Sequence, residues 1–562
     1  MLKSLPHKWL YVVAAVGAAA LVADGVITPA MTVTSAVEGL RTFSPEVPVV
    51  PIVMVIIIGI FVMQQGGTSK IGRMFGPFML VWFLMLGILG CCNIGASHEI
   101  WRAFNPWYAV RLLVDYPGWF LILGAVFLCT TGAEALYSDL GHCGRMNISV
   151  AWIFVKVMLI LNYMGQGAWI IAHLDSGVDW STVNPFYAVM PGWFVGIGVV
   201  VSTGAAIIAS QALLSGSFTI FSEAISLDFW PRQKIKYPST LKGQLYLPAV
   251  NWALLTGCLL TVLLFRDSNH MEAAYGLAIT VTMLMTTVLL AFYLRLKGVS
   301  RWVCGIFVMF FGLLEGAFFV ANLFKFTHGG WFTVLIGGLV AAMMVVWRNS
   351  TRLRGTFIQY KRLADYAGLI TSVKHDAAIP MTACNLVYFT HSPTVNMLES
   401  KLIYSIINKK PKRADHYWII HVEYLDEPDR LDYDVNIVVP QTIYFITMRI
   451  GFRVAPRVSV YLRQVVEDLV AAGEVDLTSS YPSLAAENVA GDFRFVLIHR
   501  VFSAASIISR GNARLLRLHE LLRRMKISDQ DAMGLDTSNV TMETVPLILN
   551  STPSRRITRR CQ

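Results

Sequence analysis

Long runs of apolar residues follow one another from the N-terminus to Trp347, and short polar loops separate them. A helix that crosses a bilayer needs roughly 20 apolar residues, and ten runs come close to that length. We therefore predict ten membrane spans. They cover residues 9–35, 48–65, 74–95, 117–138, 148–172, 190–215, 244–265, 271–294, 302–324 and 329–347.

After Trp347 the pattern becomes mixed and charged, as in a soluble α/β domain. Runs such as "NLVYFTH" (385–391) and "HYWIIHVEYL" (416–425) predict strands. Amphipathic stretches such as "RVSVYLRQVVEDLV" (457–470) alternate with them and predict helices. We expect a transmembrane domain, residues 1–348, and a cytoplasmic α/β domain, residues 349–562. A regulatory role suits the second domain because it is large and cytoplasmic.

The composition supports a membrane protein. The 562 residues are 55% hydrophobic and 14% charged, with a mean hydropathy of +0.56, whereas soluble domains contain roughly 25% charged residues. Eight cysteines are scattered without a C-x-x-C pair or a Cys/His cluster, so we predict buried thiols and neither a metal site nor a cofactor. Most of the net charge of +11 lies in short loops and the tail, and we expect no nucleic-acid partner.

Basic residues mark alternate loops, as expected when they stay on the cytoplasmic side. The intervening loops are poorer in bases or mixed in sign. This alternation places the N-terminus and the C-terminal domain in the cytoplasm. The bases that set the orientation are Lys3, Lys8, Lys70, Arg73, Arg145, Arg232, Lys234, Lys236, Lys242, Arg295, Lys297, Arg301, Arg348, Arg352 and Arg354.

The first span contains an aspartate that should cost about 2.5–3.5 kcal/mol to insert. Asp24, Thr28 and Thr32 are spaced i, i+4, i+8, so their side chains line one face of a helix. We call these three residues the Asp24 stripe. Pro29 cannot donate to the carbonyl of Gly25, which leaves another oxygen free nearby. These oxygens suit a monovalent cation; the alternative is that Asp24 pairs with a base or caps a kink.

The fourth span contains a second polar group, in "CTTGAEALYSDLGH" (129–142). Gly132 can let the helix unwind, and unwound backbone at mid-membrane is tolerated where it lines a cavity. Thr131 and Glu134 lie one turn apart. A desolvated glutamate with a raised pKa can carry a proton, so Glu134 is the candidate proton carrier.

Four other polar residues in the spans have less definite roles. Tyr275 either points its hydroxyl at the same cavity or packs as an aromatic near the interface. Glu38 is either a proton or cation relay or an interfacial acid. Glu315 and Lys156 either pair with each other or extend toward the interfaces.

These residues lie in segments that resemble the Kup/HAK/KT family of potassium uptake permeases, including its bacterial Kup members. The resemblance covers nearly the whole chain. The matching segments are "DGVITPAMTVTSAVEGL" (24–40), "TTGAEALYSDLGH" (130–142), "SQALLSGSF" (210–218), "GQLYLPAVNW" (243–252), "AAYGLAIT" (273–280) and "AMGLDTSNVTMETVPLI" (532–548).

The resemblance implies potassium uptake as a K+:H+ symport across the cell inner membrane. It also implies an amino acid–polyamine–cation type bundle, in which two inverted repeats of five helices each begin with a broken helix. The family's cation ligands correspond here to Asp24, Thr28, Thr32, Thr131 and Tyr275, and its proton-coupling residue corresponds to Glu134.

The family has twelve spans, and the resemblance implies that the first two are missing from this sequence, with the "GDIGTSPLY"-like motif of the first helix. Either the start codon is assigned too late, which we favour, or the gene is shortened. The alternative function is therefore a non-transporting relative that acts as a sensor or as a modulator of a full-length transporter.

The sequence contains no phosphate-cradling loop, nucleophile elbow or metal motif, and we predict that the chain is not an enzyme. In the C-terminal domain, "NARLLRLHELLRRMKI" (512–527) predicts a basic amphipathic helix. The simplest interpretation packs it on the domain's own core. The alternatives are contact with anionic membrane lipid or with a second subunit in a homodimer.

Overall fold

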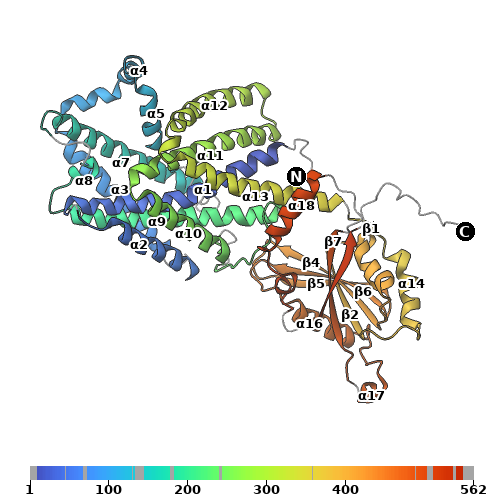
Figure 1. Ribbon diagram of the computed structural model, residues 1–562. Coiled ribbons are helices and arrows are strands. Elements are labelled where there is room, and N and C mark those ends of the chain that lie inside the picture. Colours follow the sequence, from blue (N-terminus) through green and yellow to red (C-terminus); the bar gives the residue numbers. More distant parts are fainter. Residues whose placement is uncertain are drawn as a thin grey trace, which may run out of the picture. The chain divides into compact units, whose positions relative to one another are not determined.

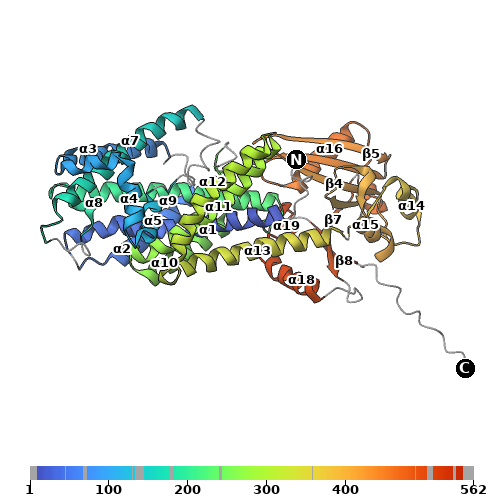
Figure 2. The same cartoon turned by 90° about the horizontal axis from the view of Figure 1, so that it is seen from above.

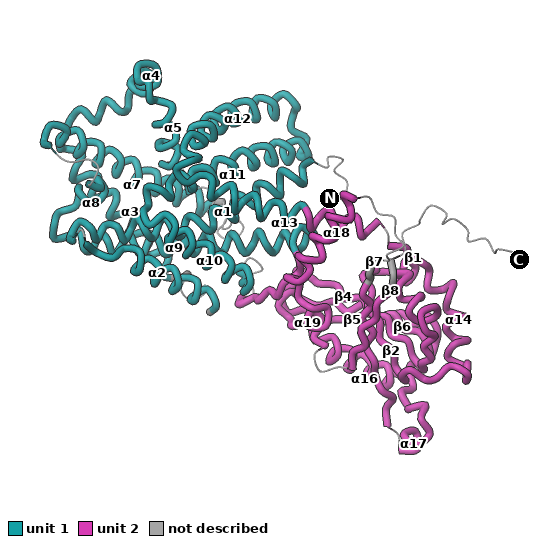
Figure 3. The backbone as a smooth tube through the Cα atoms, viewed as in Figure 1, with its two compact units in different colours: residues 1–230, 243–345 teal, residues 231–242, 346–562 magenta. Residues whose placement is uncertain are grey.

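The computed structural model consists of two compact units (Figure 3). Unit 1 comprises residues 1–230 and 243–345, and unit 2 comprises residues 231–242 and 346–562. The structure describes residues 9–44, 46–66, 72–129, 131–132, 145–177, 183–239, 244–356, 358–487, 489–502, 510–535 and 539–547.

Unit 1 is helical, and eight of its described helices are long and apolar enough to cross a membrane: α1, α3, α7, α9, α10, α11, α12 and α13. This confirms a multi-pass membrane protein. Two other predicted spans contain shorter apolar helices, α2 and α5, so the count of ten stays a prediction. The helices are α1 (Trp9–Glu38), α2 (Val49–Met63), α3 (Gly72–Ile94), α4 (Pro106–Asp115), α5 (Trp119–Leu128), α7 (Arg145–Ala172), α8 (Pro185–Ala188), α9 (Val195–Ser226), α10 (Pro248–Phe265), α11 (Ser268–Leu296), α12 (Arg301–Leu323) and α13 (Gly330–Thr356).

Helix α1 occupies the interior of unit 1 and packs against α2, α9, α10 and α11 (Figures 1 and 2). Several of its small residues, including Ala19, Ala23 and Ala30, are almost completely buried. They let the neighbouring helices approach closely, as small residues do in membrane bundles. Asp24 and Thr28 of α1 are also buried and face protein rather than lipid.

Helices α3 and α7 form another close contact, and two glycines explain it. A Cβ atom at Gly90 would collide with the backbone of Leu161, and one at Gly165 would collide with the backbone of Gly90. Only glycine at these positions allows the two backbones to approach this closely.

Unit 2 is an α/β domain, as the sequence predicted. A two-stranded antiparallel sheet pairs β1 with β3, and a six-stranded sheet has the order β5-β6-β4-β2-β7-β8. The elements are β1 (Tyr360–Lys361), α14 (Ala364–His375), β2 (Asn385–Thr390), β3 (Leu398–Glu399), α15 (Ser400–Ile403), the π-helix η7 (Tyr404–Lys409), β4 (His416–Leu425), β5 (Leu431–Val439), β6 (Ile443–Gly451), α16 (Val458–Ala471), α17 (Pro482–Ala485), β7 (Phe493–Phe502), α18 (Arg510–Arg523), α19 (Asp529–Ala532) and β8 (Val540–Leu547).

Five strands of the large sheet are parallel, and β5 pairs antiparallel with β6 at one edge. The central strands are apolar on both faces because helices cover both. Tyr417 packs on one face with α14 and α15, and Trp418 packs on the other with α16. The predicted strands at 385–391 and 416–425 and the predicted helix at 457–470 are thereby confirmed.

The predicted basic helix is α18, and its contacts within unit 2 include residues from the end of α13 and His499 of β7. The ring of His519 stacks on that of Trp347 with 4.5 Å between centroids, and Ser350 Oγ lies 3.4 Å from the Leu515 carbonyl, to which it donates. His519 is buried, whereas Leu518 and Leu521 are exposed. The helix thus packs one face on its own unit.

Candidate cation-binding site

The Asp24 stripe lies on α1, and hydrogen bonds join its members. The Thr28 hydroxyl donates to Asp24 Oδ1 over 2.5 Å, and the Thr32 hydroxyl donates to the Thr28 carbonyl over 2.7 Å. Asp24 is 1% exposed and Thr28 is also buried, while Thr32 is partly buried. The predicted spacing therefore produces a buried line of oxygen atoms.

Pro29 lies inside the continuous helix α1 and is buried with Gly25. Because proline has no N–H, it removes the hydrogen bond that the Gly25 carbonyl would otherwise accept. Gly25 also brings another oxygen close, since a Cβ atom there would collide with the hydroxyl of Ser217 on α9. Ser217 is 1% exposed, and among the described residues its Oγ has no hydrogen-bond partner.

Sequence reasoning did not single out Ser217, although it lies within the segment 210–218. A serine in an apolar helix commonly donates to its own backbone, so the sequence alone does not distinguish it from its neighbours. Ser210, for example, donates to the Ala206 carbonyl over 2.7 Å. Only the packing of α9 on α1 reveals the difference.

The second polar group begins where α5 ends. Helix α5 stops at Leu128, and Gly132 has a φ of +104°, which is outside the helical range. The Thr131 hydroxyl donates to the Leu128 carbonyl over 2.9 Å, and the Tyr275 hydroxyl on α11 donates to Thr131 Oγ1 over 3.1 Å. The backbone at Gly132 is thus not helical, in the segment where the sequence allows the helix to unwind.

A hydrophobic cluster connects the two polar groups. It contains Ile27 of α1, Phe127 of α5 and Tyr275 of α11, with Met31 and Leu128 packed against it. Ile27 and Met31 flank the Asp24 stripe on the helix surface. The structure therefore brings α1, the end of α5 and α11 together around the predicted ligands.

The structure describes one of the two predicted proton-coupling residues, Glu38. Glu134 lies outside the described residues. Glu38 is the last residue of α1 and lies about 21 Å along the helix from Asp24. Its carboxylate accepts hydrogen bonds from the backbone N–H and the hydroxyl of Ser268, over 3.1 and 2.5 Å, and so caps the first turn of α11.

The donor set consists of carboxylate, hydroxyl and carbonyl oxygens, which hard cations prefer. Among the described residues there is no group of three or more His, Cys, Asp or Glu side chains that could hold a metal ion. The arrangement suits the exchange of a cation's water shell for protein oxygens.

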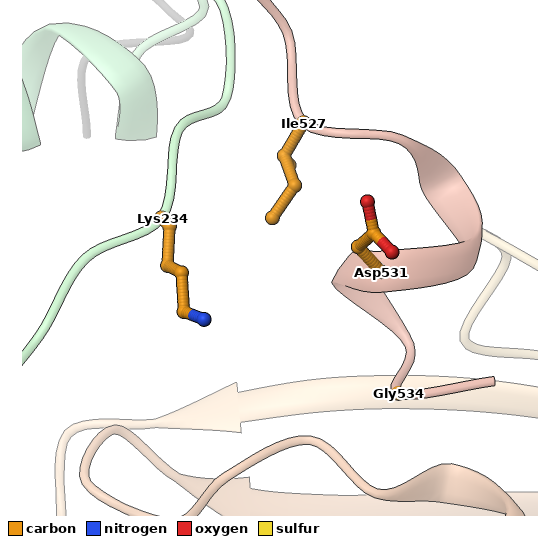
Figure 4. A pocket seen from close by; sticks show the side chains of 4 residues that line it. All are labelled: Lys234, Ile527, Asp531 and Gly534. Carbon is orange, nitrogen blue, oxygen red and sulfur yellow. The ribbon is translucent and has the colours of Figure 1, made fainter. Parts of the chain in front are cut away.

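Unit 2 contains a separate pocket of about 420 Å³ (Figure 4). Lys234, Ile527, Asp531 and Gly534 line it. The loop that carries Lys234 is fixed to the domain by a hydrogen bond from the Ile527 N–H to the Arg232 carbonyl, over 3.0 Å. Its lysine and aspartate have opposite charges, and this pocket shares no residue with the Asp24 stripe.

The chain matches two family descriptions: a K+ potassium transporter integral membrane domain over residues 3–352 and a K+ potassium transporter C-terminal domain over residues 384–545. It is similar to three proteins, each described as a probable potassium transport system protein Kup. The relative from Flavobacterium psychrophilum is 44% identical over 98% of this chain and 85% of its own length. Those from Cytophaga hutchinsonii and Streptococcus agalactiae are 46% and 42% identical, over 96% and 97% of this chain and 82% of their own lengths.

Proposed function

Because the chain belongs to the K+ potassium transporter family, we propose that it takes up potassium ions across the cell inner membrane as a K+:H+ symporter. Members of this family are transporters rather than enzymes, and a Kup transporter moves K+ without a cofactor.

The observation that carries the proposal is the buried Asp24 carboxylate with the Thr28 hydroxyl bonded to it. A carboxylate at mid-membrane is costly and is usually functional. Thr32, Thr131 and Tyr275 complete the proposed potassium ligands. Together these oxygens replace the water that an alkali cation loses on entering the membrane.

Proton coupling has an energetic reason. A monovalent cation that enters a negative interior gains about 2.3 kcal/mol per 100 mV, and each tenfold concentration ratio costs about 1.4 kcal/mol. A potential of about 100 mV alone therefore supports less than a hundredfold accumulation. A proton moving with each potassium ion supplies a second charge, and we assign its transfer to Glu134, with Glu38 at the outer end of α1.

The domain roles and the topology belong to the same proposal. Residues 1–348 form the transport domain, built as an inverted-repeat bundle of the amino acid–polyamine–cation type, and residues 349–562 form a regulatory domain. The distribution of basic residues supports cytoplasmic N- and C-termini.

The test is rubidium uptake in a host that lacks its own potassium uptake systems. Asp24→Asn removes the charge at nearly constant size, and Thr28→Val removes one hydroxyl; both should abolish uptake at limiting potassium. Thr34→Val is the matched control, because Thr34 is also buried on α1 and donates to the Ala30 carbonyl over 2.6 Å but faces about 120° away from Thr28.

If the Asp24→Asn variant takes up as much rubidium as the Thr34→Val variant, the proposed site is refuted. For coupling, Glu134→Gln should make the rubidium flux independent of external pH, and an unchanged pH profile would exclude Glu134 as the proton carrier. A parent chain that folds and inserts but takes up no rubidium would favour the sensor or modulator alternative.

A further inference from the structure

Helix α12 contains a glutamate that is buried, although most of the helix is exposed. Leu313 is 71% exposed and Leu314 is 45% exposed, whereas Glu315 is 5% exposed. Glu315 lies near the middle of a 23-residue apolar helix. Its carboxyl group therefore faces α11 within the bundle and lies at membrane depth.

The two oxygens of this carboxyl group have different surroundings. The hydroxyl of Thr287 on α11 donates to Glu315 Oε1 over 2.8 Å. Glu315 Oε2 is buried and has no hydrogen-bond partner among the residues that the structure describes. The Glu315 carboxyl group thus accepts its hydrogen bond from a neutral hydroxyl, that of Thr287.

Within the described part of the chain, the elements packed against α12 place no charged group beside Glu315. Described α5 has no charged residue. Lys156, the suggested partner on α7, lies over the ring of Trp152 at 5.0 Å. The other titratable groups of α11 and α12 lie at least about 9 Å along their helices from Thr287 or Glu315. They are His270, Glu272, Tyr275, Tyr293, Arg295, Arg301 and Cys304.

An ionised carboxylate in this position would lack both water and a cation, which is strongly unfavourable. A protonated carboxylic acid is neutral, and its carbonyl oxygen keeps the bond from Thr287. We propose that Glu315 is a proton-binding site within the membrane: it carries a proton on Oε2 at neutral pH, while Thr287 donates to Oε1 and joins α12 to α11.

The proton on Glu315 stabilises the contact between the two helices, because its loss leaves a buried charge between them. Helix α11 also carries Tyr275, twelve residues from Thr287 and about 18 Å along the same helix. A link from Glu315 to potassium uptake rests on the proposed function, whereas proton binding itself does not.

The experiment is infrared spectroscopy of the full chain in lipid vesicles at pH 7.5, where exposed carboxyl groups are ionised. The parent spectrum minus that of Glu315→Gln should contain the C=O stretching band of one protonated carboxylic acid. Other buried acids are present in both proteins and cancel. Glu223→Gln, which changes an exposed acid on α9, is the control and should leave this spectral region unchanged.

Thr287→Val keeps the size of the side chain but removes the donor, so the same band should move to higher frequency. This variant also decides the question if Glu315→Gln does not fold. A parent spectrum without a band that either substitution removes or shifts would overturn the proposal, because the carboxylate would then be ionised and hold a cation instead. None of these readouts depends on transport.

Discussion

Strand β8 lies at the edge of the large sheet, and a buried ion pair connects it to the rest of unit 2. Glu543 on β8 is 9% exposed and Lys412 is 6% exposed. Their Nζ and Oε1 atoms are 3.1 Å apart, and the Ser405 hydroxyl donates to Glu543 Oε2 over 2.6 Å. Replacing Lys412 by methionine removes the positive charge at similar length and should loosen β8.

The size of the effect follows from burial. Breaking a buried pair by removing one partner costs about 3–5 kcal/mol, because the other charge is left uncompensated. The pair is nearly inaccessible, so water screens it little. Burial also lowers the pKa of Lys412, which the Glu543 carboxylate counteracts. The lysine therefore depends on the same contact as the glutamate.

The assay is amide hydrogen exchange of the full chain, followed by mass spectrometry of peptides from β8. A loss of 3–5 kcal/mol in local stability corresponds to exchange faster by roughly two to three and a half powers of ten. Lys409→Met is the matched control, since Lys409 also reaches β8, with Nζ 2.8 Å from the Thr544 carbonyl, but is exposed. Its loss should change exchange by less than about tenfold.

The double variant tests the physical reason. Replacing Lys412 by methionine and Glu543 by leucine together leaves no uncompensated charge and should restore most of the protection. Exchange in β8 that is equal in the Lys412→Met and Lys409→Met variants would refute the argument, and so would a double variant that is as unprotected as Lys412→Met alone.

Two further predictions concern helix packing and pH. Gly90→Ala should destabilise the protein by about 1–3 kcal/mol and lower its thermal midpoint more than Gly87→Ala does. The added Cβ at position 90 meets the backbone of Leu161, whereas that at position 87 meets the flexible side chain of Met158. Equal midpoints would contradict this. Burial lowers the pKa of His416 to about 4 from an ordinary 6.5, so the unfolded chain binds a proton first as the pH falls. Stability should drop by up to about 3 kcal/mol between pH 6.5 and 4, and His416→Phe should flatten that part of the curve in urea unfolding.

The sequence predicted the elements well where one local property decides them. The run "HYWIIHVEYL" was predicted as a strand over 416–425, and β4 has the same bounds. The consecutive residues Tyr417 and Trp418 of β4 point to opposite faces of the sheet, and both are fully buried. This is expected for a central parallel strand that is covered on both faces. Apolar runs likewise predicted the eight long helices, because the preference for lipid depends on composition.

Helix ends were harder to predict, since single backbone torsions decide them. The predicted spans 48–65 and 117–138 contain helices of 15 and 10 residues. Residues 64–66 continue the first as a 3₁₀ turn, and α5 stops before Gly132 with its positive φ.

Tertiary neighbours were not predictable either. The Asp24 stripe follows from spacing within one helix. Ser217 beside Gly25 joins helices far apart in the sequence, and Thr287 bonded to Glu315 joins two consecutive helices. A single sequence gives the face of each helix but not which face meets it, so these polar groups emerged only from the packed bundle.

Glu38 illustrates how an acid can have a structural and a proposed proton-coupling role together. Its two oxygens accept from the N–H and the hydroxyl of Ser268, at the positive end of the dipole of α11, where a negative charge is stabilising. A proton bound by Glu38 would remove that charge and weaken the cap. Because Tyr275 lies seven residues further along α11, about 10 Å from the cap, such a change would act on the helix that carries a proposed potassium ligand. The cap therefore connects the C-terminal end of α1 to the helix that carries a proposed potassium ligand, without contact between Glu38 and that ligand.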